Sequence, residues 1–342
     1  MRILYTADLH LTDRPNDEYR WDVFPWLEKR MVRYNVQYLI ILGDMTDRKD
    51  DHSAALVNRL VDNLSMLAKR CKMMFLLKGN HDYVDANVPF FRFLHNSLRG
   101  KLLFYHMPVE IGMFQERWLF LPHTRGFRSE YGKYDLAKYD KVFLHQPIRG
   151  AMTESGGKMD DGIRRKSLAR AKRVFAGDIH VPQTLGNITY IGAPYPVRYG
   201  DTYTPRVILE EDGKFRDLIR KTIRKDSIKI GSIEEFDRCA YIPGDMVKVE
   251  VALPRTDIKQ WHPIQRHIEK FCRKNNVTLG GLRLTEVDEQ RRQHRVRVTQ
   301  RTVSPTETLR NYGRVRRMTP QRIAAGLDIL AESIGKGGDH HG

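Results

Sequence analysis

The sequence predicts an α/β fold followed by a smaller C-terminal domain, and three observations lead to this prediction. Short apolar runs at residues 1–7, 38–42 and 73–77 have the composition of buried strands. Segments with helical periodicity, at residues 19–34 and 53–70, separate these runs. A length of 342 residues is enough for about two domains.

The composition favours a polyanionic partner. Lys and Arg number 59 against 42 Asp and Glu, so the net charge is +17, which would attract nucleic acid or an anionic membrane surface. No apolar run approaches a membrane span, and the N-terminus enters a strand without a signal-peptide pattern. Cys71, Cys239 and Cys272 are far apart and suggest neither disulfides nor a metal knuckle. We therefore expect a cytoplasmic protein without a membrane partner.

The first predicted strand, residues 1–7, leads directly into Asp8-Leu9-His10. Alternation along an extended chain places Asp8 and His10 on the same side. A carboxylate and an imidazole at a strand end can hold one divalent cation, although such a short motif is more commonly a solvated loop. The helix expected in residues 19–34 comes next, and Pro25 suggests where it begins.

The second and third predicted strands also end in polar residues. Residues 38–42 run into Gly43-Asp44-Met45-Thr46-Asp47, so a carboxylate lies at the carboxyl end of a strand, where open α/β sheets bind ligands. After the helix expected at residues 53–70, the third strand runs into Gly79-Asn80-His81-Asp82. The Asn carbonyl is a hard oxygen ligand, the His can ligate or transfer a proton, and the Asp can orient the His. Three such strand ends are stronger evidence than any one motif.

Further strands are expected after residue 100. Residues 101–121 have the pattern of a β-meander. One later strand ends at His145, and another ends in Gly177-Asp178-Ile179-His180, where Asp178 and His180 face the same side. A lone histidine such as His145 is usually structural, but its position at a strand end favours a role in the site.

The order of these motifs resembles the calcineurin-like metallophosphoesterase superfamily over about residues 1–210. The resemblance implies a metallophosphoesterase β-sandwich flanked by helices. Residues 190–194 (YIGAP) and 198–201 (RYGD) resemble the SbcD-type branch, DNA-repair nucleases that work with an SMC-like ATPase and have relatives in bacteriophages. The implied function is a DNA exo- or endonuclease subunit whose partners are DNA and an SbcC-type ATPase; a homodimer is left open.

The resemblance also implies a role for each motif residue. The ligands of the first metal would be Asp8, His10 and His180. The ligands of the second would be Asn80 and His145, and Asp44 would bridge both metals. His81 would stand over the leaving group, held by Asp82, and Asp47 would support the site. Two divalent cations, Mn²⁺ or else Mg²⁺, would activate a water for in-line attack on phosphorus.

One position departs from the family pattern. The superfamily usually has Gly-His-x-His where this chain has Gly177-Asp178-Ile179-His180. Asp178 therefore stands where a histidine ligand of the second metal belongs. A carboxylate can still ligate, directly or through a water, and the alternative is a weakened second site.

Two further features precede the Asp178 motif. Residues 154–162 have the composition of a mobile loop. Six basic residues follow this loop: Arg164, Arg165, Lys166, Arg170, Lys172 and Arg173. They form either a clamp for the phosphate backbone of DNA or the solvated face of a helix, and the sequence does not decide between the two.

A change in composition near residue 240 suggests three parts. Residues 1–242 would form the nuclease domain. Residues 243–300, with a strand, an amphipathic helix and another strand, resemble the α/β capping domain that holds DNA over the metals in SbcD-type nucleases. Residues 301–342 would form a basic linker and a helix that begins at Thr319-Pro320. The apolar stripe of that helix either packs on its own domain or docks on the ATPase.

Three functions are compatible with these observations. The first is a DNA nuclease subunit of the SbcCD type, and the second is a phosphoesterase of the same fold that acts on a phosphoprotein or a small nucleotide. The third is a non-catalytic DNA-binding subunit, which the nearly complete ligand set disfavours. The net charge of +17 and the C-terminal extension favour the first function over the second. No Walker A sequence is present, so ATP binding by that route is not expected.

Overall fold

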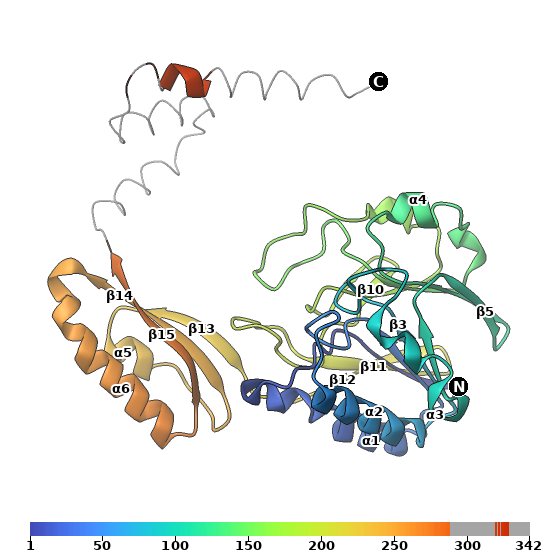
Figure 1. Cartoon of the computed structure of the whole chain (residues 1–342), viewed down its shortest axis with the longest axis horizontal. Helices are drawn as coiled ribbons and strands as arrows, with labels where there is room; N and C mark the ends of the chain where they lie inside the picture. The colour runs from blue at the N-terminus through green and yellow to red at the C-terminus, as the bar shows by residue number, and fades with distance from the viewer. Residues whose placement is uncertain (288–318, 320, 322, 328–342) are drawn as a thin grey trace. The chain divides into compact units, whose positions relative to one another are not determined.

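The fold is taken from a computed structural model, which describes residues 1–287, 319, 321 and 323–327. In this part of the chain the strands form two six-stranded sheets and one three-stranded sheet (Figure 1). The larger compact unit comprises residues 1–250 and 264–283, and the remaining described residues belong to a second unit.

The first sheet contains the strands that the sequence predicted to end in ligand residues. Its order is β12-β11-β1-β2-β3-β4, with β1 to β4 parallel and β11 antiparallel to β1. The strands are β1 (Arg2–Thr6), β2 (Tyr38–Leu42), β3 (Met73–Leu77), β4 (Leu102–Tyr105), β11 (Arg206–Glu211) and β12 (Lys214–Ile219). Because β1, β2 and β3 are parallel, their carboxyl ends meet at one edge of the sheet.

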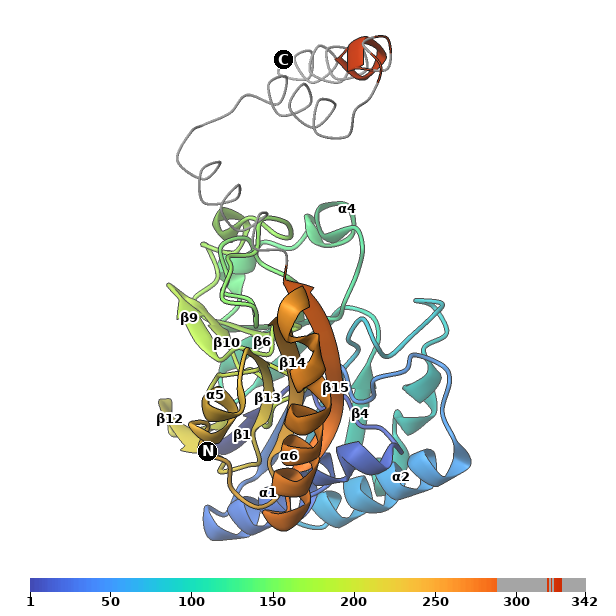
Figure 2. The same ribbon diagram turned by 90° about the vertical axis from the view of Figure 1, so that its left-hand side faces the viewer.

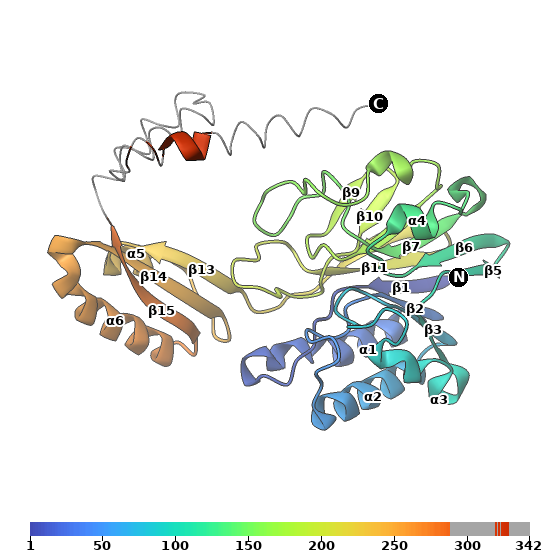
Figure 3. The ribbon, with the colours of Figure 1, turned by 45° about the horizontal axis from the view of Figure 1, so that its top comes forward.

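Helices α1 (Val23–Arg33) and α2 (Ala54–Ala68) cover the outer face of this sheet (Figure 3). The predicted leucine stripe of α2 is buried there, and the Ser53 side chain caps the helix by accepting a hydrogen bond from the backbone N–H of Leu56 at 3.1 Å. Shorter helical segments lie at Pro15–Arg20, Phe90–Leu94 and Ser97–Gly100 (α3).

The prediction that the first long helix begins at Pro25 is wrong by two residues. Helix α1 begins at Val23, so Pro25 lies in its first turn. The first N–H groups of a helix have no acceptor within the helix, and a proline there removes no hydrogen bond.

The second sheet has the order β5-β6-β7-β8-β10-β9. Its strands are β5 (Val109–Met113), β6 (Glu116–Leu121), β7 (Lys141–His145), β8 (Val174–Gly177), β9 (Gln183–Leu185) and β10 (Ile188–Tyr190). Strands β6, β7 and β8 are parallel, so the carboxyl ends of β7 and β8 lie at the same edge of this sheet. Short helical segments lie at Phe127–Tyr131 (α4), Leu136–Lys138 and Arg165–Ser167.

The predicted meander at residues 101–121 is not formed. Strand β4 pairs in parallel with β3 in the first sheet, whereas β5 and β6 pair with each other in the second. Strand β4 joins the first sheet because its side chains are buried on both of its faces. Leu102 and Phe104 pack toward the helices, and Tyr105 packs between the two sheets. Burial on both faces is typical of a parallel strand inside an α/β sheet.

Aromatic side chains fill the space between the two large sheets. The ring of Tyr5 in β1 stacks on Phe175 in β8 with a centroid distance of 4.7 Å. Phe75 in β3 faces Phe120 in β6 at 5.7 Å. Alternation along β1 explains this layer, because Tyr5 points between the sheets while Leu4 points toward the helices. The predicted β-sandwich flanked by helices is therefore confirmed.

The three-stranded sheet has the order β13-β14-β15. Its strands are β13 (Lys225–Ile230), β14 (Met246–Pro254) and β15 (Thr278–Val287), and the associated helical segments are α5 (Ile233–Asp237), Arg255–Gln260 and α6 (Trp261–Lys274). Figure 2 turns this segment toward the viewer. The strand–helix–strand order expected between residues 243 and 300 is present, with Ile264 and Ile268 buried along α6. The sheet also includes β13, which precedes the predicted boundary at residue 243.

The predicted C-terminal helix falls only in part on described residues. Residues 323–327 are helical, and the backbone N–H of Ile323 donates to the Thr319 carbonyl at 3.1 Å. The arginine-rich linker before Thr319 and the end of the predicted helix lie outside the described residues. Within the described ranges, no helix combines the length and the apolar character that crossing a membrane requires.

Candidate metal centre

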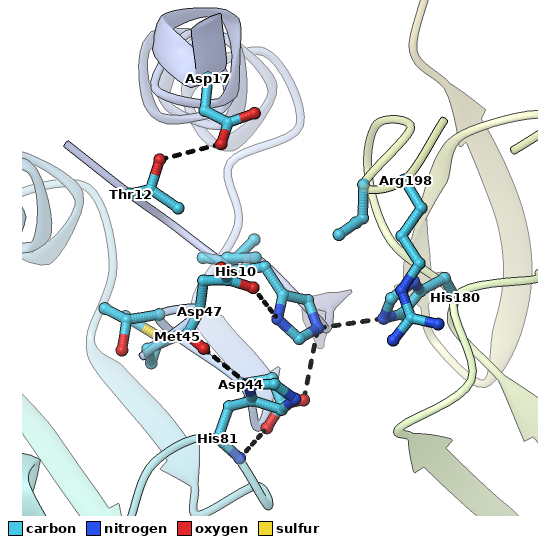
Figure 4. A network of polar contacts seen from close by, with 12 residues as sticks. His10, Thr12, Asp17, Asp44, Met45, Asp47, His81, His180 and Arg198 are labelled. Atoms are coloured by element: carbon cyan, nitrogen blue, oxygen red, sulfur yellow. Dashed lines mark hydrogen bonds and ion pairs between the residues drawn. The ribbon is translucent and has the colours of Figure 1, made fainter. Parts of the chain in front are cut away.

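The site lies where the carboxyl ends of β1, β2, β3, β7 and β8 converge. The loops that follow β1 and β2 are tied together by two backbone hydrogen bonds, from Asp8 N–H to the Gly43 carbonyl at 3.1 Å and from His10 N–H to the Asp44 carbonyl at 2.9 Å. Figure 4 shows His10, Asp44, His81 and His180 pointing toward one another. Side chains from five loops thus meet in one region.

Four of the candidate ligands have backbones in the left-handed region, which is uncommon for residues other than glycine. The φ angles are 55° at Asp8, 42° at His10, 53° at Asp44 and 92° at Asp178. Gly79 is constrained by space and not by its φ angle, since a Cβ atom at this position would overlap the Asp44 carboxylate. Strained backbones clustered in this way are a feature of functional sites.

The first cluster joins Asp8, His10 and His180, all of them buried. The Nε2 atoms of His10 and His180 face each other at 3.0 Å, and Asp8 Oδ2 is buried without a hydrogen-bond partner among the described residues. A cation between these atoms could take a lone pair from each of them, and this set of one carboxylate and two imidazoles fits a divalent metal.

The second cluster is built around His145 and Asp44. His145 Nε2 lies 3.4 Å from Asp44 Oδ1 and 2.9 Å from the side-chain oxygen of Asn80. With the Asn80 amide turned, its nitrogen would donate to the two Asp44 oxygens at 3.2 and 3.1 Å. One carboxylate, one amide and one imidazole converge here, and this set of donor atoms also fits a divalent metal.

Asp44 belongs to both clusters. Its Oδ1 faces His145, while its Oδ2 lies 3.4 Å from His10 Nε2. A single carboxylate thus directs one oxygen toward each cluster, which is the arrangement that a bridging ligand requires.

Burial and charge set the protonation of these groups. Burial raises the pKa of the Asp8 carboxyl and lowers that of the His10 imidazole. Burial alone would also raise the pKa of Asp44, but the neighbouring His145 outweighs it, so the Asp44 carboxylate stays ionised. The pKa of His145 is raised in turn, because Asp44 outweighs burial there. In the protein without metal, the pair is therefore held together as an ion pair.

Asp178 lies at the edge of the second cluster. Its Oδ1 is 3.7 Å from His145 Nε2, and its backbone N–H donates to Asp8 Oδ1 at 2.9 Å. Burial raises the pKa of the Asp178 carboxyl to about 6. Among the described residues, three groups of three side chains bring their potential ligand atoms within 4.8 Å of one another, and Asp178 belongs to none of them. Direct ligation by Asp178 stays a prediction.

The prediction that Asp82 holds the His81 ring is wrong. The buried Asp82 carboxylate accepts hydrogen bonds from three backbone N–H groups, of Gly79 at 2.7 Å, Asp44 at 2.9 Å and Met45 at 3.0 Å. The His81 ring is held by the Asp47 carbonyl, which accepts from Nδ1 at 2.8 Å. Asp82 therefore fixes the loop that carries Asp44, and Asp47 fixes the histidine.

Two functional candidates escaped the sequence analysis. Glu154 Oε1 accepts a hydrogen bond from the backbone N–H of His180 at 3.0 Å, although no motif marks this residue. Arg198 is exposed beside His180, and its side chain makes no hydrogen bond or ion pair to any described residue (Figure 4). Its place within Arg198-Tyr199-Gly200-Asp201 was the only sequence signal for it.

The six basic residues that follow residue 162 do not form the face of a long helix. Three of them are held by neighbours: Arg170 pairs with Asp135 at 3.2 Å, Lys172 pairs with Asp140 at 2.6 Å, and Arg173 lies over the Phe215 ring at 4.0 Å. Arg164, Arg165 and Lys166 are exposed and form no ion pair with described residues. These three are the members of the set that have neither an ion-pair partner nor a ring contact among the described residues.

Comparison with known proteins shows that more than half of the chain matches one protein family. Residues 1–182 match the family model described as calcineurin-like phosphoesterase. No curated protein matches the chain. Among solved structures, the chain is similar to the protein of unknown function AQ665 from Aquifex aeolicus, with 16% identity, a TM-score of 0.24 and coverage of 44% of this chain and 79% of that one.

Proposed function

The chain belongs to the calcineurin-like phosphoesterase family, and we propose that it is a metal-dependent nuclease that hydrolyses phosphodiester bonds in DNA. The family implies metal-dependent hydrolysis of phosphoesters, and DNA as the substrate is our proposal. The observation that best supports metal-dependent hydrolysis is the position of the Asp44 carboxylate. One of its oxygens lies 3.4 Å from His10, and the other lies 3.4 Å from His145. A site built for two cations suits in-line displacement at phosphorus.

The residues of the two clusters would hold the cations. Asp8, His10 and His180 supply one set of donors, Asn80 and His145 supply the other, and Asp44 serves both. Divalent cations bound there would polarise a phosphoryl oxygen and lower the pKa of a water molecule. The His145 imidazole is oriented for this role, because Nδ1 donates to the Leu42 carbonyl at 2.6 Å and leaves Nε2 directed into the site.

His81 would act on the leaving group. Its Nδ1 donates to the Asp47 carbonyl at 2.8 Å, so Nε2 is the ring nitrogen left to face the site, and it can give a proton to the departing oxygen only from the imidazolium form. Its backbone N–H donates to Asp44 Oδ1 at 2.8 Å, which fixes the residue beside the candidate ligands. The His81 ring also lies within 4.8 Å of donor atoms of His10 and Asp44, so its role as an acid and not as a ligand is part of our proposal. This position suits a general acid.

Charge supports DNA as the substrate. The chain has a net charge of +17, and Arg164, Arg165, Lys166 and Arg198 have no ion-pair partner among the described residues. Free guanidinium and ammonium groups bind phosphate oxygens and release counterions from DNA. A small phosphoester would not need so much positive charge.

We also propose the wider SbcD-type organisation. Residues 243–300 would hold DNA over the metals, and the segment 301–342 would dock on an SMC-like ATPase. The strand–helix–strand order of β14, α6 and β15 is compatible with the first of these roles. Docking on an ATPase is supported only by the resemblance of residues 190–194 and 198–201 to the SbcD-type branch.

The test is hydrolysis of end-labelled single-stranded and double-stranded DNA with Mn²⁺, with Mg²⁺ and with chelator. We expect cleavage that requires metal and that Asp44→Ala abolishes. A small aromatic phosphodiester and a phosphomonoester serve as competing substrates. Faster turnover of either small ester than of DNA would favour the second function, and DNA binding without any metal-dependent cleavage would favour the third.

A further inference from the structure

Glu154 lies against the metal centre although it belongs to a surface loop. Its side chain is 20% exposed, while that of Asp161 in the same loop is 99% exposed. Its Oε1 accepts a hydrogen bond from the His180 backbone N–H at 3.0 Å and lies 3.4 Å from His180 Nδ1. One carboxylate oxygen thus faces both the main chain and the ring of a candidate ligand.

The loop that carries Glu154 is fastened on the side of the second sheet. The Gln183 side chain in β9 accepts from the Met152 N–H at 2.7 Å and donates to the Met152 carbonyl at 2.8 Å. Within the loop, the Thr153 N–H donates to the Gly157 carbonyl at 2.8 Å, which closes a turn around Glu154. Hydrogen bonds on both sides therefore define the position of its carboxylate.

A histidine can ligate a metal through Nε2 only when that nitrogen carries a lone pair. An oxygen placed at Nδ1 favours the proton there and so leaves Nε2 free. His180 Nε2 points into the site, 3.0 Å from His10 Nε2, while its Nδ1 faces Glu154. The Nδ1 contact has the distance of an ion pair without the alignment of a hydrogen bond, and the backbone hydrogen bond is the firmer of the two.

The other two histidine ligands differ in how firmly Nδ1 is held. His145 Nδ1 donates to the Leu42 carbonyl at 2.6 Å, whereas His10 Nδ1 lies 3.7 Å from Asp47 Oδ1 and has no hydrogen-bond partner among the described residues. An oxygen thus lies nearest the outer ring nitrogen in all three, within hydrogen-bond distance at His145 and at ion-pair distance at His180 and His10.

We propose that Glu154 is a positioning residue that keeps the His180 imidazole in the form whose Nε2 can bind the first metal. This inference rests on the metal centre of the proposed function and not on DNA as the substrate. It gives the loop at residues 149–162 a role in the site, because displacement of the loop would withdraw the carboxylate from His180.

Three variants test the proposal in the full-length chain. Glu154→Ala removes both contacts. Glu154→Gln keeps an oxygen for the His180 N–H but loses the charge at Nδ1. Asp161→Asn removes the same charge from an exposed position of the same loop and is the matched control. Mn²⁺ binding by calorimetry and the imidazole ¹⁵N shifts of the metal-free protein are the readouts, with the His180 signals assigned by their loss in His180→Asn.

We expect Glu154→Ala to weaken one of the two Mn²⁺ sites by roughly 10- to 100-fold and to leave the other unchanged. The Mn²⁺ affinity of this site in Glu154→Gln should lie between the affinities in Glu154→Ala and wild type. In Asp161→Asn it should equal the wild-type affinity. In the metal-free protein, the Nδ1-protonated form of His180 should dominate in wild type and lose population in Glu154→Ala.

Wild-type Mn²⁺ affinity at both sites in Glu154→Ala, with an unchanged His180 tautomer, would overturn the proposal. If Glu154→Ala does not fold, the Mn²⁺ affinity and the His180 tautomer are measured in Glu154→Gln instead. Wild-type values of both in that variant would also overturn the proposal. The outcome is separate from that of the nuclease proposal. A protein that binds two Mn²⁺ but cleaves no DNA would contradict the nuclease and leave the role of Glu154 intact.

Discussion

The Asp82 carboxylate accepts the backbone N–H of Asp44 at 2.9 Å. The proposed bridging residue is therefore positioned by an acid from a different loop, because Asp82 follows β3 whereas Asp44 follows β2. The N–H groups of Met45 and Gly79 complete the set of donors to Asp82. This relationship connects the stability of the fold to the geometry of the metal centre.

Asp82→Ala should therefore destabilise the protein as well as inactivate it. Three buried N–H groups lose their acceptor, and we expect the free energy of unfolding to fall by about 2–4 kcal/mol. Urea denaturation of the metal-free protein measures the change. Asp85→Ala is the control, because the exposed Asp85 carboxylate accepts a hydrogen bond only from the nearby Asn87 N–H among the described residues. Equal denaturation midpoints for Asp82→Ala and wild type would show that the three hydrogen bonds contribute nothing.

His81→Asn should separate catalysis from metal binding. If His81 protonates the leaving oxygen, turnover should fall by roughly 10²-fold while the metal content and the melting temperature stay at wild-type values. Steady-state kinetics, metal analysis by mass spectrometry and thermal denaturation give the three quantities. His262→Asn, on an exposed position of α6, should leave all three unchanged. Loss of metal together with activity would instead make His81 a ligand.

Much of the site was predictable, because parallel strands bring their carboxyl ends to one edge and the motifs lie at those ends. The pairing of β4 was not predictable from the sequence. Whether β4 joins the first or the second sheet depends on the packing of Phe104 toward the helices and of Tyr105 between the sheets. The role of Asp82 was not predictable either, because its acceptor oxygens reach N–H groups on another loop. Glu154 approaches His180 through the fold of a loop that has no motif.

Asp178 should determine the preference of the site for metals. A carboxylate in place of the family's histidine makes the second cluster richer in oxygen, and oxygen donors favour Mn²⁺ or Mg²⁺ over Zn²⁺. We predict that Mn²⁺ activates best, that Asp178→His shifts the preference toward Zn²⁺ or Fe²⁺, and that Asp178→Ala weakens one metal only. Titration of activity and metal content in the three proteins is the test. The same preference and stoichiometry in all three would place Asp178 outside the coordination shell.

His123 should make the metal-free protein sensitive to acid. Its Nδ1 shares a hydrogen bond with the Tyr83 hydroxyl at 2.8 Å, and burial lowers its pKa to about 3. The unfolded chain binds a proton at this residue below about pH 6.5, whereas the folded chain does not. Stability from this group is thus complete above about pH 6.5 and is lost as the pH falls toward 3.

His123→Gln should be less stable than wild type at pH 7.5 but should lose less stability on acidification. Between pH 7.5 and 5.0 the difference in loss should be about 2 kcal/mol or less. Urea denaturation at both pH values in the presence of chelator measures it. Parallel losses in the two proteins would contradict the burial of a neutral His123.

The most direct test of the metal centre is the electron paramagnetic resonance spectrum of the protein titrated with Mn²⁺. The geometry of Asp44, with its two oxygens each 3.4 Å from a histidine of a different cluster, predicts two Mn²⁺ per chain with a spin-coupled signal. Asp44→Ala should abolish the coupling and lose at least one ion. A single Mn²⁺ per chain, or two that remain magnetically independent in the wild-type protein, would contradict a centre bridged by Asp44.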